Sequence, residues 1–147
     1  MKKKICGGFS LGVLLSIICL VLVGCGGGGS SDGGGTSTAA VAVVDCSTVT
    51  PAATVTAEQT LQFSPDSVTI HVNDVVRWVS ASTLAHTVTS GIVTGGTVTT
   101  ATPDGKFDQP LNTSGSSVCL KFTVAGQYNY YCTHHFSSGM KGEVTVQ

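Results

Sequence analysis

A two-residue alternation of apolar and polar side chains constrains the fold of this chain more than any other feature. It is clear over residues 68–73 and again over residues 118–124. Successive side chains of a β-strand point to opposite faces, so this period predicts strands with one buried face. The turn-forming pairs Asn73-Asp74 and Ala125-Gly126 end these two runs. No ten-residue stretch after residue 24 has good helical periodicity, which argues against a helical fold.

The composition supports the same fold class. Val and Thr are abundant, whereas Lys, Glu and Leu are scarce, and only 10% of the residues are charged. We therefore predict an all-β protein, a Greek-key β-sandwich of short strands. Residues 91–117 are rich in Gly, Thr, Ser and Pro, and we expect them to form a long loop region. Phe107 and Leu111 are its few plausible anchors in the core.

The N-terminus has the features of an export signal. Three lysines, Lys2 to Lys4, precede an uncharged apolar stretch over residues 5–24, which ends Leu22-Val23-Gly24-Cys25. This segment resembles a bacterial lipoprotein signal, and the resemblance implies cleavage before Cys25 and attachment of lipid to that residue. A retained transmembrane anchor or an ordinary secretory signal are the alternatives. All three place the domain outside the cytoplasm, in the periplasm or at the cell surface.

The chain divides into three parts. We expect a signal peptide over 1–24, a lipidated cysteine with a Gly/Ser-rich tether over 25–38, and a single domain over 39–147. The flexible tether has a root-mean-square reach of about 20 Å, which lets the domain reorient above the membrane. After residue 24 the chain has 4 basic and 8 acidic side chains. This balance, with no basic patch, argues against a nucleic-acid partner.

The sequence has one strong candidate site near its C-terminus. Cys132, His135 and Met140 have the spacing Cys-x2-His-x4-Met, and His86 lies 46 residues before the cysteine. Zinc prefers four strong Cys or His ligands, and calcium and magnesium prefer oxygen. Copper accepts a thiolate, two imidazoles and a weak thioether in both of its oxidation states. These four residues therefore predict a site for one copper ion.

Three segments carry a family resemblance. Residues 128–146 resemble the C-terminal signature of the small blue (type 1) copper proteins, in the plastocyanin/pseudoazurin branch of the cupredoxin superfamily. Residues 86–90 are similar to the segment of the first histidine in that family, and residues 63–78 to the strand pair that precedes it. The resemblance implies a cupredoxin-like sandwich that holds one copper at one end. By position, it implies that the ligands are His86, Cys132, His135 and Met140.

Each of these residues also has a simpler interpretation. His86 could be polar surface, Cys132 could be half of a disulfide, and Met140 could fill the core. His134 could replace its neighbour as the ligand, although the x2 spacing selects His135. His71 alternates with apolar residues and is expected to face solvent. Thr87 stands where plastocyanins have Asn. The resemblance therefore does not predict the hydrogen bonds that this residue makes to the loop that carries Cys132, His135 and Met140.

The number of cysteines fits a metal thiolate. Two cysteines leave with the leader and Cys25 is taken by lipid, so three remain in the domain. If Cys132 binds the metal, Cys46 and Cys119 are free to form a disulfide. That bond would close a loop of about 70 residues, for which chain entropy predicts a stabilisation of about 4 kcal/mol.

The expected site has four protein ligands and no open position for a substrate, so we do not expect an enzyme. We expect a monomeric carrier of one electron between redox partners, such as a cytochrome or an oxidoreductase, that dock near His135. Leu84, Phe136 and Gly139 could supply a small apolar docking patch. A copper protein for storage, delivery or resistance is the alternative. A structural or adhesive sandwich without metal is a third, which leaves the spacing of His135 and Met140 unexplained.

Overall fold

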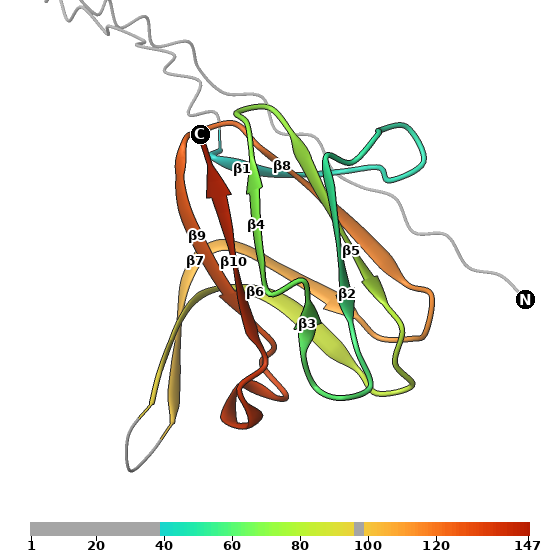
Figure 1. Ribbon diagram of the computed structural model, residues 1–147, viewed down its shortest axis with the longest axis vertical. Coiled ribbons are helices and arrows are strands. Elements are labelled where there is room, and N and C mark those ends of the chain that lie inside the picture. The colour runs from blue at the N-terminus through green and yellow to red at the C-terminus, as the bar shows by residue number, and fades with distance from the viewer. Residues whose placement is uncertain (1–38, 96–98) are drawn as a thin grey trace, which may run out of the picture. The chain divides into compact units, whose positions relative to one another are not determined.

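The computed structural model describes residues 39–95 and 99–147, which form two five-stranded β-sheets (Figure 1). In the order of its strands, the first sheet contains β1 (Val41–Val44), β8 (Ser117–Phe122), β5 (Val75–Ser80), β2 (Ala53–Ala57) and β3 (Phe63–Ser64). The second contains β4 (Ser67–Ile70), β10 (Lys141–Val146), β9 (Gly126–Tyr131), β6 (His86–Thr94) and β7 (Thr100–Leu111). The predicted all-β sandwich is confirmed.

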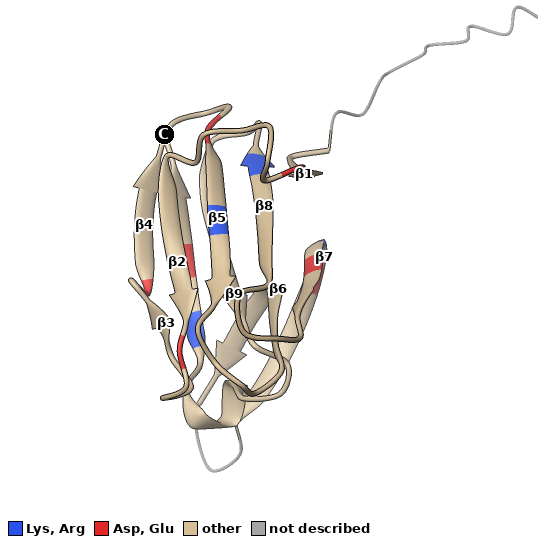
Figure 2. Ribbon diagram, turned by 90° about the vertical axis from the view of Figure 1, so that its right-hand side faces the viewer, with Lys and Arg blue, Asp and Glu red and all other residues tan. Residues whose placement is uncertain are grey.

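The chain passes repeatedly between the sheets. β3 and β5 belong to the first sheet, whereas β4, which lies between them in sequence, belongs to the second. Most neighbouring strands are antiparallel, but β2 pairs with β5, and β4 with β10, in parallel. Charged residues are sparse on the strands, and Figure 2 shows no cluster of Lys and Arg on the face in view.

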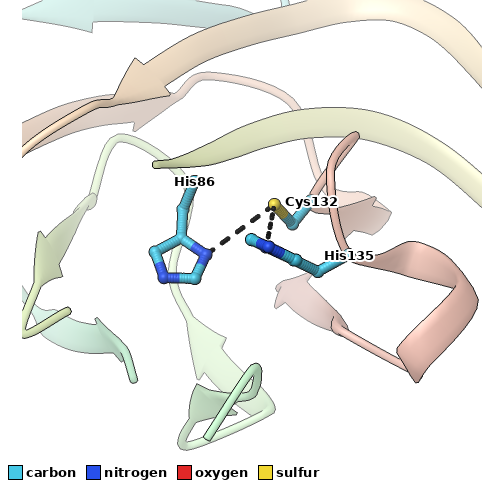
Figure 3. Close-up of side chains that lie close together, drawn as sticks. All are labelled: His86, Cys132 and His135. Atoms are coloured by element: carbon cyan, nitrogen blue, oxygen red, sulfur yellow. Dashed lines mark hydrogen bonds between the residues drawn. The ribbon is translucent and has the colours of Figure 1, made fainter. Parts of the chain in front are cut away.

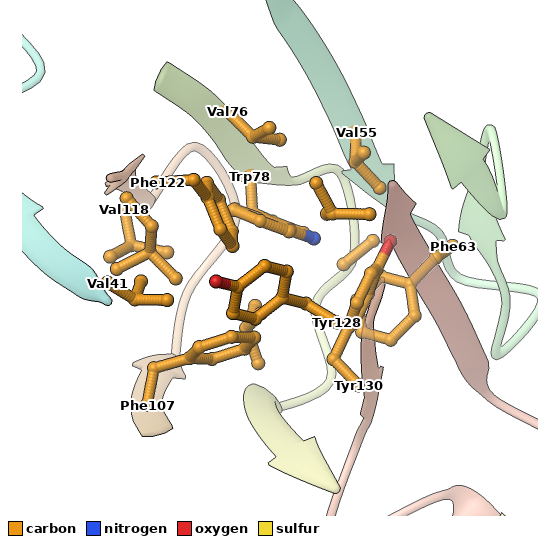
Figure 4. Close-up of a cluster of buried hydrophobic side chains, with 14 of the residues drawn as sticks. Val41, Val55, Phe63, Val76, Trp78, Phe107, Val118, Phe122, Tyr128 and Tyr130 are labelled. Carbon is orange, nitrogen blue, oxygen red and sulfur yellow. The ribbon is translucent and has the colours of Figure 1, made fainter. Parts of the chain in front are cut away.

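Aromatic side chains fill the space between the sheets (Figure 4). Trp78 is fully buried, and its ring centroid lies 5.3 Å from that of Tyr130 and 6.4 Å from that of Phe107. Phe122 also packs against Trp78, at 6.5 Å. These rings come from both sheets, so burying them ties the two layers together. Val88 of β6 and Tyr130 of β9 belong to the same core, which anchors both strands.

The expected long loop over 91–117 is wrong, because most of this region forms strands. β6 continues to Thr94, and β7 runs from Thr100 to Leu111 in an antiparallel pair with it. β7 contains Pro103 and Pro110, which argued against a strand, but it lies at the edge of its sheet, where a missing N–H is tolerated. Phe107 and Leu111 are buried, as expected.

A glycine accommodates the bend in this hairpin. The register between β6 and β7 shifts between Thr89 and Gly91, and Gly91 has a φ of 144°. A Cβ at Gly91 would lie 2.7 Å from the Cα of Pro103, so a larger residue would push the strands apart. The glycine that suggested a loop is therefore part of a β-bulge.

A disulfide joins Cys46 to Cys119, with their Cα atoms 5.3 Å apart. Cys46 follows β1 and Cys119 lies in β8, where it is paired in register with Val44. The bond therefore fastens the first strand of the domain to its neighbour. Cys132 is the free cysteine of the described residues, and it is buried.

The predicted signal peptide, Cys25 and the tether lie in residues 1–38, outside the described residues. The expectations for them therefore remain predictions. In the part of the chain that the structure describes, no helix has the length and apolar character needed to cross a bilayer.

Candidate metal centre

Two neighbouring strands bring distant parts of the sequence together at one end of the sandwich. His86 is the first residue of β6, and Cys132 directly follows the last residue of β9. These strands are antiparallel, with Thr89 opposite Tyr131. The start of β6 therefore meets the end of β9. His135 lies on the loop that follows Cys132, which adds a second imidazole at the same place.

The three donor atoms face one another (Figure 3). The Nδ1 atom of His86 lies 3.8 Å from the Sγ atom of Cys132, and the Nδ1 atom of His135 lies 3.4 Å from the same sulfur. The ligand atoms of all three residues lie within 4.8 Å of one another. The two imidazole rings approach to 5.0 Å between centroids.

Burial favours the neutral form of both imidazoles, because it lowers the pKa of each ring. His86 and Cys132 are fully buried, whereas His135 is partly exposed. Burial lowers the pKa of His86, and repulsion from His135 and His134 lowers it further. Burial also lowers the pKa of His135, with a further contribution from His134. A neutral imidazole has a free lone pair, so both rings can donate to a metal at neutral pH.

The spacing of these atoms fits a shared metal ion. Imidazole nitrogen and thiolate sulfur bind a metal such as zinc at about 2.0 and about 2.3 Å, so in a trigonal arrangement they lie about 3.7 Å apart. The observed nitrogen–sulfur distances of 3.8 and 3.4 Å are close to this value. One thiolate with two imidazoles matches the preference of copper for soft and borderline donors. The residues present therefore fit a copper ion.

Comparison with known families agrees with this donor set. The family model for copper binding proteins of the plastocyanin/azurin family matches residues 49–147. The chain belongs to this family. It is 37% identical over 89 residues to the plastocyanin of Scenedesmus fuscus, covering 59% of this chain and 88% of that protein. It is 34% identical over 89 residues to a Synechococcus plastocyanin, covering 58% of this chain and 64% of the other.

Solved structures support the fold. A reduced Cu(I) form of an amicyanin variant superimposes with a TM-score of 0.54 at 21% sequence identity, covering 74% of this chain and 99% of amicyanin. An oxidised amicyanin variant gives the same TM-score over 73% of this chain and 98% of its own. At this level of identity the likeness concerns the arrangement of the strands.

The loop of this plastocyanin/azurin-family protein that carries the ligands is closed by its own backbone. The N–H of Cys132 donates to the carbonyl of Met140 at 3.1 Å, and the N–H of Met140 donates to the carbonyl of His135 at 3.3 Å. Met140 is fully buried and belongs to the core cluster. Its backbone is thus held beside Cys132 and His135, and the role of its thioether as a copper ligand remains a prediction.

The other two histidines of the domain contribute no ligand atom to this cluster. His134 is exposed and is not part of the group formed by His86, Cys132 and His135. His71, which directly follows β4, is also exposed, as predicted. The structure therefore brings together the histidine that the x2 spacing selected.

Sequence reasoning missed the turn that shapes the ligand loop. A short 3-10 helix, η1 (Phe136–Ser138), ends at Gly139, whose φ of 89° is in the left-handed region that favours glycine. The N–H of Gly139 donates to the carbonyl of Phe136 at 3.0 Å. The Ser-Ser-Gly sequence before Met140 was the available signal, but Gly139 was assigned only to a docking patch.

Thr87 contacts the segment that contains Cys132 through its backbone and its side chain. Its backbone N–H lies 3.4 Å from the Sγ atom of Cys132, and its Oγ1 atom accepts a hydrogen bond of 2.9 Å from the N–H of Thr133. The sequence identified Thr87 only as a departure from the asparagine of plastocyanins. In this protein the hydroxyl of Thr87 itself holds the ligand loop.

Proposed function

We propose that this protein carries single electrons on one type 1 copper ion bound by His86, Cys132, His135 and Met140. The observation that supports this most directly is the cluster of one buried thiol and two imidazole nitrogens at the end of a rigid sandwich. Bound copper would supply a one-electron couple between Cu(II) and Cu(I).

The residues around the cluster suit electron transfer better than catalysis. Four protein ligands leave no position for a substrate, which is why we propose a carrier and not an enzyme. The chain also holds these residues in a fixed arrangement, because strand pairing fixes His86 and Cys132, and backbone hydrogen bonds close the loop from Cys132 to Met140. A fixed arrangement limits the movement that accompanies a change of oxidation state.

His135 is the natural point of exchange with a partner. It is partly exposed, whereas His86 and Cys132 are fully buried. Leu84, which is 40% exposed, and the partly exposed Phe136 are apolar residues that we assign to the docking patch. We propose that a redox protein, such as a cytochrome or an oxidoreductase, docks there briefly as a small, weak contact.

A visible spectrum and a redox titration test this function. The copper-loaded protein should show an intense blue thiolate-to-copper band, which a reductant removes and an oxidant restores. Loss of this band should also follow the addition of a reduced cytochrome. Copper binding without rapid, reversible exchange of electrons would indicate a storage or delivery protein instead. A colourless protein that binds zinc as readily as copper would contradict the proposal.

We also propose that the protein is a lipoprotein of the cell envelope, tethered through Cys25. The sequence Leu22-Val23-Gly24-Cys25 supports this proposal. Cys25→Ser removes the lipid acceptor, so we expect the protein to lose its membrane anchor or to keep an uncleaved signal. Incorporation of a labelled fatty acid distinguishes these cases from a normal lipoprotein. Unchanged labelling of the Cys25→Ser variant would contradict the proposal.

A further inference from the structure

Four polar side chains form a line from the ligand loop to the edge of the second sheet. The Oγ1 atom of Thr87 lies 3.1 Å from that of Thr133 and 2.9 Å from that of Thr89. The Oγ1 atom of Thr89 lies 2.7 Å from the Oδ1 atom of Asp108. Thr89 and Asp108 are opposite each other in β6 and β7. The line therefore starts beside Cys132 and ends at a carboxylate on the edge strand.

The carboxylate fixes the direction of every hydrogen bond in this line. An ionised carboxylate only accepts, and each threonine hydroxyl has one proton to donate. Thr89 therefore donates its proton to Asp108, and its oxygen accepts the proton of Thr87. With its own proton in use, the hydroxyl of Thr87 can only accept a hydrogen bond from Thr133.

Thr133 supplies two donors for that oxygen. Its backbone N–H donates to the Oγ1 atom of Thr87 at 2.9 Å, and its hydroxyl lies 3.1 Å from the same atom. The two lone pairs of Thr87 are then both filled. Each hydroxyl proton of Thr133, Thr87 and Thr89 is thus donated to the next oxygen in the line. It is one polarised chain, and hydrogen bonds in such chains strengthen one another.

We propose that Asp108, acting through Thr89, holds Thr87 as an acceptor and so positions the Cys132–Thr133 segment for the metal. The inference has two parts. The structural part, that the chain of hydrogen bonds holds Thr133, concerns the metal-free protein. The electronic part, that this chain affects the reduction potential of bound copper, rests on the proposed function. Thr87 is the central positioning residue, because its N–H also faces the sulfur of Cys132. Asp108 is exposed, and its negative charge makes the bond to buried Thr89 stronger than a bond between neutral groups.

Amide hydrogen exchange in the metal-free protein, with its disulfide intact, tests the structural part. Thr87→Val removes the acceptor, so we expect the amide of Thr133 to exchange about five-fold faster, the effect of losing one ordinary hydrogen bond. Thr89→Val and Asp108→Asn should each accelerate this amide by about two-fold, because they weaken the chain at a distance. Thr89→Ser keeps the hydroxyl and should restore the wild-type rate.

The same pair of strands supplies a matched control. The hydroxyls of Thr94 and Thr100 lie 2.8 Å apart on β6 and β7, away from the ligand loop. Thr94→Val removes this contact and should leave the exchange of Thr133 unchanged. An equal acceleration in Thr94→Val would overturn the proposal, because it would show a general loosening of the hairpin.

A double variant tests whether the carboxylate acts through Thr89. In Thr89→Val the link is already broken, so adding Asp108→Asn should not accelerate Thr133 further. Independent, multiplicative effects would overturn the proposal, as would an unchanged rate in Thr87→Val.

The copper-loaded protein provides a second readout. Thr89 carries no charge, so a change in reduction potential in Thr89→Val that Thr89→Ser reverses would indicate positioning of the ligand loop. An unchanged potential in Thr89→Val would overturn the electronic part. If the wild-type protein shows no blue band, the proposed function fails, but the exchange result still decides the structural part.

Discussion

Cys132→Ser should abolish the blue absorption of the copper-loaded protein. The sulfur of Cys132 lies 3.8 Å from Nδ1 of His86 and 3.4 Å from Nδ1 of His135, so it is close to both of the other candidate ligand atoms. A serine hydroxyl is harder and remains protonated at neutral pH, so it replaces neither the charge nor the softness of a thiolate. We therefore expect loss of the thiolate-to-copper band and weaker binding of copper. Titration with copper, followed by visible absorption, measures both effects.

The fold of this variant should remain intact, because Ser differs from Cys by one atom and Cys132 takes no part in the disulfide. His71→Gln is a matched control, since it changes an exposed histidine far from the cluster. It should leave the blue band unchanged. A Cys132→Ser protein with a full blue band would show that another residue supplies the thiolate.

Removal of the disulfide should lower the free energy of unfolding by about 4 kcal/mol. The bond between Cys46 and Cys119 closes a loop with a sequence separation of 73 residues. Removing this cross-link increases the conformational entropy of the unfolded chain. The double variant Cys46→Ala/Cys119→Ala also frees β1, which pairs only with β8 within its sheet. Urea unfolding of the metal-free proteins measures the difference.

Chemical reduction of the unmutated protein should give a similar loss of stability. Cys132→Ser serves as the control, because it removes a thiol without removing a cross-link. Equal stability of the double variant and the wild type would contradict this prediction. Three reactive thiols in the unfolded, unreduced domain would contradict the disulfide itself.

The sequence predicted strands where the alternation is regular, and missed β7 and the end of β6, where the pattern is interrupted. Val118, Leu120 and Phe122 belong to the core cluster and alternate with Cys119 and Lys121, which do not, and they form β8. The hairpin of β6 and β7 contains a bulge at Gly91 and two prolines, so its local pattern resembles a loop. Only its position at the edge of a sheet, which is a tertiary property, makes those residues compatible with a strand.

The candidate site divides in the same way. The Cys-x2-His spacing is local, and the structure brings Cys132 and His135 together. His86 was proposed from the chemistry of the donor set and from the family resemblance, because no local rule relates residues that neighbouring strands bring together. The role inferred for Asp108 depends on its register opposite Thr89, which could not be predicted while residues 91–117 were interpreted as a loop.

The position of the cluster at the end of the sandwich has a consequence for maturation. The aromatic core around Trp78 packs the two sheets together, and the bond between Cys46 and Cys119 fastens β1 to β8. Neither Trp78 nor the disulfide belongs to the metal cluster. In the folded domain, burial shields the thiol of Cys132 from exchange with the disulfide. We therefore expect the domain to fold first and to receive its copper afterwards, so that supply of the ion, and not assembly of the polypeptide, sets when the protein becomes active.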